Sequence, residues 1–240
     1  MTDEQRIADF VQDLYLTRYN RELDSTAVGD EDYLIERNKT IRWANMFADE
    51  LEQETDTSGQ PINWNFLRDD NLELGEITEA GQLFTLPAEV LRLVFDENRP
   101  LTLEYDGTVV ARFDVVDPNQ ITRRTDATED RVTVVGGNLA FSRPFTEEEI
   151  GATVVADVIN KIPRLTASSA EMLTTVKPYQ LLILGVAKNA TLPDIVQGGL
   201  SPSFAQKYAD LLEQVKLNND VSSTADGYNA DDYGYIGGIW

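Results

Sequence analysis

The sequence contains neither cysteine nor histidine. This excludes disulfide bonds, thiolate and imidazole metal ligands, cysteine nucleophiles and histidine general bases. Most of the common catalytic sites depend on one of these groups. We therefore expect a protein that is not an enzyme and that binds no cofactor or metal. Structural proteins, binding modules and enzymes that use only carboxylates remain.

Basic residues are also scarce, with 20 lysines and arginines against 42 aspartates and glutamates, a formal net charge of −22. An acidic surface of this kind repels nucleic acid phosphates, so specific DNA binding is not expected. Long apolar runs are absent as well. The longest, residues 181–187, is too short to cross a bilayer, and no membrane partner is expected.

Two amphipathic helices are predicted in the first quarter of the chain. The first follows from four apolar residues at helical spacing, which are Ile7, Phe10, Val11 and Leu14. The second is predicted over residues 30–54, where no glycine or proline intervenes and one stripe is apolar, formed by Leu34, Ile41, Ala44, Ala48 and Leu51. Together they predict a helical hairpin over residues 1–56.

The middle of the chain, residues 57–145, is predicted to be β-rich. Residues 101–105 and 109–116 have the composition of strands and flank Asp106-Gly107, a pair that favours tight hairpin turns. A second hairpin is predicted from residues 131–135 and 138–142, because Gly136-Gly137 between them readily adopts positive φ.

Residues 146–219 are predicted to form a C-terminal helical region. Thr146 followed by three glutamates is typical of a helix start, but the valines and isoleucine of residues 154–159 also permit a strand, and both alternatives stay open. Pro178 predicts a buried core helix after it, and Ser201-Pro202 predicts another that ends near residue 219. The expected fold class is α+β: a helical bundle with a β-hairpin-rich middle insertion and an extended C-terminal arm.

Residues 220–240 are expected to form that arm. The segment is acidic and glycine-containing, yet it carries apolar anchors, which are Tyr228, Tyr233, Tyr235, Ile236 and Trp240. These anchors suit pockets on a partner, and the alternative is that the segment folds back on its own subunit. Its aspartates do not have the spacing of a calcium-binding loop. Arg123, Arg124 and Arg131 form a local basic cluster, which we interpret as a candidate subunit interface.

The order of these parts resembles the head-to-tail adaptor, or connector, proteins of tailed bacteriophages. The segments that carry the resemblance are residues 86–93 (LPAEVLRL), 141–145 (FSRPF), 163–165 (PRL) and 178–182 (PYQLL). The resemblance implies a structural virion protein in the phage neck, made in the host cytoplasm. Its expected partners are the portal protein, a tail or nozzle protein and further copies of itself, commonly twelve in a ring, with DNA passing through unbound.

Two other functions are compatible with the composition. Exposed aromatics and β-hairpins suit a surface or sugar-binding module, although the long terminal helices argue against a protein that should be β-rich throughout. A hydrolase that uses only carboxylates would need a separated Asp/Glu pair, one member having a raised pKa. No local motif indicates such a pair.

Overall fold

The computed structural model describes residues 1–20, 22–23, 30–94, 100–116, 121, 130–195 and 203–223. The chain divides into two compact units. The helical unit combines residues 1–66 with residues from 162 onward, and the sheet unit is residues 67–161. The first 66 residues and the described residues between 162 and 223 therefore fold together, and the middle forms a separate body.

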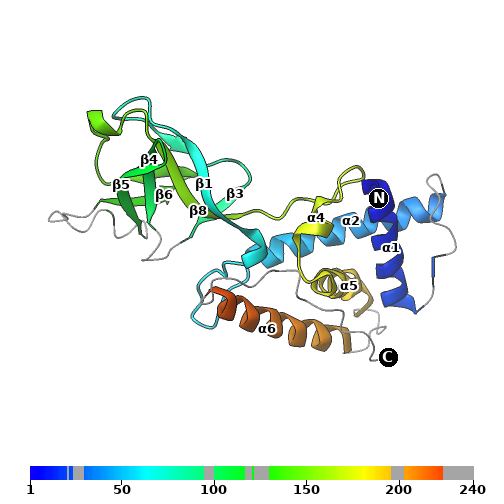
Figure 1. Ribbon diagram of the computed structural model, residues 1–240. Coiled ribbons are helices and arrows are strands. Elements are labelled where there is room, and N and C mark those ends of the chain that lie inside the picture. Colours follow the sequence, from blue (N-terminus) through cyan, green and yellow to red (C-terminus); the bar gives the residue numbers. More distant parts are fainter. Residues whose placement is uncertain are drawn as a thin grey trace. The chain divides into compact units, whose positions relative to one another are not determined.

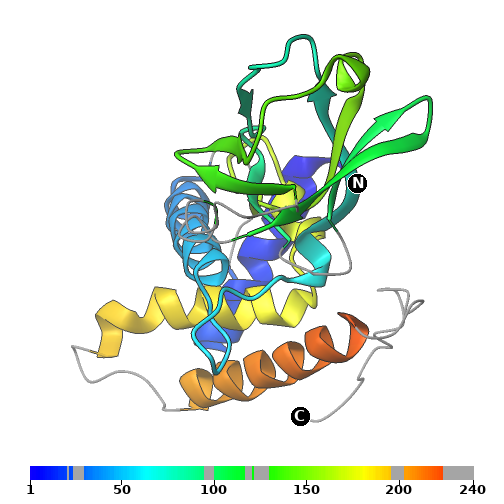
Figure 2. The same cartoon turned by 90° about the vertical axis from the view of Figure 1, so that its left-hand side faces the viewer.

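The helical unit is built around α5 (Figure 1). Its α-helices are α1 (Asp3–Tyr19), α2 (Glu31–Glu52), α4 (Glu171–Thr175), α5 (Tyr179–Ile195) and α6 (Ser203–Ser223), and a short 3₁₀ helix η1 (Asn65–Leu67) leads out of it. Helix α5 contacts all four of the others, and Figure 2 shows α5 and α6 side by side. The core helix expected after Pro178 is thus confirmed as α5.

Caps explain where the first two helices begin and end. The Thr2 hydroxyl accepts a hydrogen bond from the Gln5 amide, and α1 ends at Asn20, which has a left-handed φ of 52°. The Asp30 carboxylate accepts from two amides in the first turn of α2. Both helices predicted from the sequence are present, and the second lies within two residues of its expected limits.

Helices α2 and α5 approach closely because α5 has a glycine at the crossing point. A Cβ placed on Gly185 would lie only 2.2 Å from Cε2 of Phe47, a fully buried ring on α2. Phe47 in turn packs edge-on against Tyr208 of α6, with ring centroids 6.1 Å apart. One aromatic side chain therefore links three helices, and only glycine leaves room for it.

The expectation of a helical bundle carrying two hairpins is wrong, because an eight-stranded curled sheet, a half-barrel, dominates the middle of a mixed α/β protein. The strands run in the order β1-β8-β4-β5-β6-β7-β2, and β3 also pairs with β8. They are β1 (Arg68–Glu76), β2 (Phe84–Thr85), β3 (Val90–Leu93), β4 (Leu101–Tyr105), β5 (Thr108–Val115), β6 (Arg131–Val135), β7 (Asn138–Phe141) and β8 (Thr153–Asn160).

Strand β8 is the reason for this difference. It comes from the stretch left open between helix and strand, and a short 3₁₀ helix η2 (Glu147–Glu149) precedes it. It pairs with β1, β3 and β4, so it joins separate segments into one sheet. The two predicted hairpins, β4–β5 and β6–β7, are present but are parts of this sheet, joined by a short parallel pairing of β5 and β6.

Candidate assembly site

Three carboxylates, Asp49, Glu50 and Glu52, lie at the C-terminal end of α2, and a fourth, Glu54, lies two residues beyond it. No basic residue lies in the last turn of the helix. This is an unfavourable arrangement, because the C-terminus of a helix is the negative end of its dipole. Stabilisation must come from other parts of the chain. We refer to these four carboxylates and their partners as the α2 anchor.

The first partner is the segment that follows β8. The Ile162 amide donates to Oε1 of Glu52 over 2.7 Å, and the Arg164 guanidinium donates to both Glu52 oxygens over 3.1 and 3.0 Å. Arg164 also binds Asp49 over 2.7 Å. The Glu52 side chain is only 9% exposed. Where the chain returns to the helical unit, it is therefore fixed on α2.

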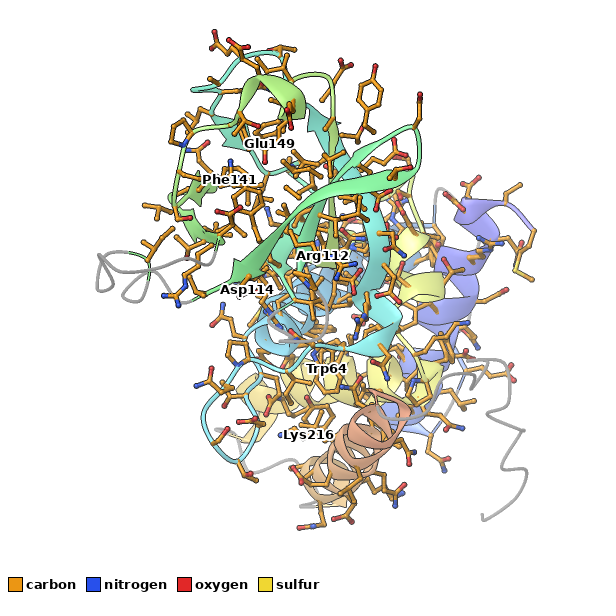
Figure 3. The ribbon with its side chains drawn as sticks, turned by 60° about the vertical axis from the view of Figure 1, so that its left-hand side comes forward. Trp64, Arg112, Asp114, Phe141, Glu149 and Lys216 are labelled. Atoms are coloured by element: carbon orange, nitrogen blue, oxygen red, sulfur yellow. The ribbon has the colours of Figure 1, made fainter. Side chains whose placement is uncertain are left out.

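Helices α5 and α6 supply the other cations. Lys188 of α5 binds Glu50 over 2.9 Å, and Lys216 of α6, labelled in Figure 3, binds Glu54 over 2.8 Å. The Lys188 ammonium also lies 4.8 Å from the centre of the Tyr208 ring. Burial raises the pKa of the Tyr208 phenol, and the nearby carboxylates raise it further. The anchor thus joins three helices through charged contacts.

The segment that leads out toward β1 is held at the same end of α2. The indole N–H of Trp64 donates to the Leu51 carbonyl over 2.9 Å, and the Trp64 side chain is fully buried. Its ring stacks on Phe66 with an interplanar angle of 22°. The segment that leads to β1 and the segment that follows β8 are therefore both attached to the last turns of α2.

The end of α6 is fixed to that outgoing segment by Asn219. Its side-chain oxygen accepts from the Asn65 amide over 2.8 Å, and its side-chain nitrogen donates to the Asn63 carbonyl over 2.9 Å. The Asn65 side chain donates back to the Asn219 carbonyl over 3.2 Å. Residues 220–240 therefore continue from a point that is held in place.

The sheet unit has a charged cluster of its own around Arg143. The guanidinium donates to both oxygens of Asp130 and both oxygens of Glu149, over 2.6–2.8 Å, and lies 5.0 Å from the centre of the Phe113 ring. Glu149 also accepts from the Thr146 amide over 2.7 Å. The Arg143 hydrogen bond holds the pKa of Glu149 below its ordinary value. The cluster ties the segments flanking β6 and β7 together.

This cluster lies against an aromatic group inside the curled sheet. Phe113 and Phe141 contact each other edge to face at 5.0 Å, and Phe84 and Phe145 complete the group. Glu149 and Phe141 are both labelled in Figure 3, within the sheet unit. The arginine therefore covers the apolar core while its charge is satisfied by two carboxylates.

Most of the site residues expected from the sequence lie outside the described residues. These are the five anchors of the arm, Tyr228, Tyr233, Tyr235, Ile236 and Trp240, and also Arg123 and Arg124. Arg131 is described and begins β6, where its amide donates to the Ser142 hydroxyl over 2.9 Å and its carbonyl accepts from the Ser142 amide over 2.8 Å. The roles proposed for all of them stay predictions.

Sequence reasoning missed the α2 anchor and the Arg143 cluster. One available signal was the run of carboxylates at the end of a predicted helix without lysine or arginine nearby, which indicates that cations arrive from elsewhere. Another was that Arg143 and Arg164 both lie in segments already singled out, residues 141–145 and 163–165. Which carboxylate each arginine meets depends on tertiary packing.

Neither cluster has the composition of a metal centre. Within the ranges that the structure describes, no group of three or more acidic side chains could hold a metal ion. No described helix is long and apolar enough to cross a membrane. Comparisons with protein-family models and with curated proteins give no match for this chain.

Proposed function

We propose that this chain is a structural virion protein, a subunit of the ring that joins the portal to the tail of a tailed bacteriophage. The observation that best supports this is that four basic side chains of its charged clusters are paired with carboxylates of the same chain. Arg143, Arg164, Lys188 and Lys216 each bind carboxylates contributed by other segments. Such networks make a subunit rigid and engage these groups in structural contacts rather than in acid–base chemistry.

Two of the segments that carry the resemblance to adaptor proteins coincide with these fixed points. Residues 163–165 contain Arg164 of the α2 anchor, and their Leu165 backbone exchanges two hydrogen bonds with the Asn45 side chain. Residues 141–145 contain Arg143 and two rings of the aromatic group. The resemblance therefore rests on residues that fix the architecture, as expected for a structural subunit.

The same geometry argues against the carboxylate-only hydrolase. A general acid in such an enzyme needs a raised pKa. Glu149 is a buried carboxylate, yet its pKa is lowered by its ion pair with Arg143. Glu149 therefore stays ionised and paired with Arg143, which suits a structural role.

In the proposed function, residues 220–240 are the arm that docks on the portal. Residues 220–223 form the end of α6, and Asn219 and Lys216 hold the turn just before them. Because the start of the arm is held in place, less conformational entropy is lost when the arm binds its pocket. Its tyrosines, isoleucine and tryptophan supply the apolar anchors, and a net charge of −22 in every copy disfavours binding of the passing DNA.

The test combines the purified full-length chain with the portal protein of the same phage. We expect native mass spectrometry and electron microscopy to reveal a ring of this chain stacked on the portal. Deleting residues 224–240, which come after α6, should leave the circular dichroism spectrum unchanged and abolish co-purification with the portal. A chain that stays monomeric and ignores the portal would overturn the proposal.

A matched pair of full-length variants separates the anchors of the arm from its charge. Replacing Tyr228, Tyr233, Tyr235, Ile236 and Trp240 by serine should abolish portal binding. Replacing the arm's aspartates by asparagine keeps those anchors and should retain portal binding. The opposite pattern would show that charge, rather than the aromatic anchors, attaches the arm.

A further inference from the structure

The outer face of α2 carries a stripe that is both basic and apolar. Ile35, Lys39, Arg42 and Met46 are all exposed and follow at i, i+4, i+7 and i+11, so they lie on one side of the helix. Ile35 is 44% and Met46 is 40% exposed. At the rise of an α-helix the stripe is roughly 16 Å long. We call it the α2 stripe.

The outer face of α1 carries a stripe of opposite charge. Asp9, Asp13, Leu16 and Tyr19 are exposed and follow at i, i+4, i+7 and i+10. Leu16 is 41% and Tyr19 is 45% exposed, and Asp13 also accepts a hydrogen bond from the Tyr179 hydroxyl over 2.9 Å. This α1 stripe is roughly 15 Å long, which matches the α2 stripe.

The positive charge of the α2 stripe is unusual in so acidic a chain. Lys39 contacts Glu36 one turn away over 2.7 Å, but the Lys39 side chain stays 50% exposed, and pairs screened by water in this way contribute little to stability. Arg42 forms no ion pair with any residue in the described part of the chain. Two apolar side chains beside two cations in water contribute little to the fold of one copy, so their arrangement suits a contact between copies.

We propose that the α2 stripe of one copy packs against the α1 stripe of a second copy, and that this contact repeats around the ring. The inference rests on the proposed function. Because the two faces differ, the contact is head-to-tail, which is the type that closes into rings. Two α1 stripes or two α2 stripes repel each other, so charge also suppresses the wrong pairings.

Charge reversal tests the pairing directly. The variant Lys39→Glu with Arg42→Glu makes both stripes acidic, and the variant Asp9→Lys with Asp13→Lys makes both basic. We expect each variant alone to associate at least tenfold more weakly than the wild type, measured by sedimentation and mass photometry. Mixed in equal amounts, they should assemble again, because every contact then joins an acidic face to a basic one.

Further variants control for these changes. Lys207→Glu and Asp210→Lys, made as separate variants, each reverse one charge on the exposed face of α6 and should leave assembly unchanged. If loss of the hydrogen bond between Asp13 and Tyr179 disturbs the fold, seen by circular dichroism, Asp9→Lys alone replaces the double variant. Assembly that is unaffected by the acidic variant, or that is not restored by mixing, would overturn the proposed contact.

Cross-linking gives an independent measurement, because the chain has no native cysteine. We expect a Leu16→Cys copy to form a disulfide with an Ile35→Cys or a Met46→Cys copy, according to the direction in which the helices run. A Leu217→Cys copy, exposed on α6, is the control. Cross-linking no faster than this control would refute the contact.

The outcomes separate the two proposals. Rings that persist in all the charge variants would refute the stripe contact and leave the adaptor proposal intact. A wild-type chain that forms no ring, alone or with the portal, would refute both.

Discussion

Replacing Gly185 by alanine tests how the helical unit is packed. In the middle of a helix this change ordinarily stabilises a protein by about 0.5–1 kcal/mol, because alanine loses less backbone entropy than glycine. Here the new methyl would lie 2.2, 2.4 and 2.8 Å from three atoms of the Phe47 ring. Carbon atoms in contact normally lie about 3.5–4.0 Å apart, so the ring or the helix must shift by more than about 1 Å.

The shift is costly because the Phe47 ring has no free space around it. Its side chain is fully buried, and Tyr208 packs against it. Overpacking a core costs about 1–3 kcal/mol, and three overlapping ring atoms put Gly185→Ala at the upper end. After subtracting the helix gain, we expect a net loss of about 2 kcal/mol in the free energy of unfolding, or a melting temperature lower by about 4–8 °C.

Urea unfolding followed by far-UV circular dichroism measures this loss. Gly81→Ala is the control, because no atom lies within 4 Å of the added methyl, and it should change stability by less than about 0.5 kcal/mol. In a Phe47→Leu background the clash is relieved, so Gly185→Ala should cost about 1 kcal/mol less than in the wild type. A Gly185→Ala variant as stable as the wild type would refute the reasoning.

Three further predictions concern the charged contacts. Arg164→Ala should lower the free energy of unfolding, measured by urea unfolding, by about 1–2 kcal/mol, because Glu52 loses its cation. Solvent screening of the partly exposed arginine limits the loss to this size. The control, Arg6→Ala, removes an exposed ion pair and should change the free energy of unfolding by less than about 0.5 kcal/mol. The stabilisation from the lowered pKa of Glu149 is complete above its ordinary value near 4.5 and is lost as the pH falls through the folded-state value. Glu149→Gln should therefore cost about 1–2 kcal/mol at neutral pH and flatten the acid dependence of unfolding; an unchanged acid dependence would contradict this. Asn219→Ala should accelerate hydrogen exchange of the backbone amide bonded to its side chain about tenfold, and an unchanged rate would show that the α6 end is not held there.

Local sequence patterns predicted those turns and helices that are determined by residues close together in the chain. Asp106 and Gly107 have φ values of 48° and 72°, and Gly136 and Gly137 have 60° and 81°, as tight hairpin turns require. Helical spacing likewise placed the first two helices. These features depend on neighbouring residues, which the sequence displays directly.

The full sheet was not predictable in this way. Most residues of β8 are buried on both faces, so the strand shows no alternation that would distinguish it from a buried helix. In β1, register shifts near Leu72 and Gly75 interrupt the pairing, and β2 has only two residues. The pairing of β1 with β8 joins segments far apart in the chain, as do the contacts of Arg164 with α2.

The placement of α5 has a consequence for synthesis of the protein on the ribosome. Helices α1 and α2 emerge first, but the helix that covers their apolar faces follows the whole sheet unit. At about 5–20 residues per second, synthesis of the chain between α2 and the end of α5 takes on the order of 10 s. During this time the sheet unit is fully synthesised, whereas the helical unit is not. A nascent chain, or one truncated before α5, thus lacks the helix that completes the helical unit.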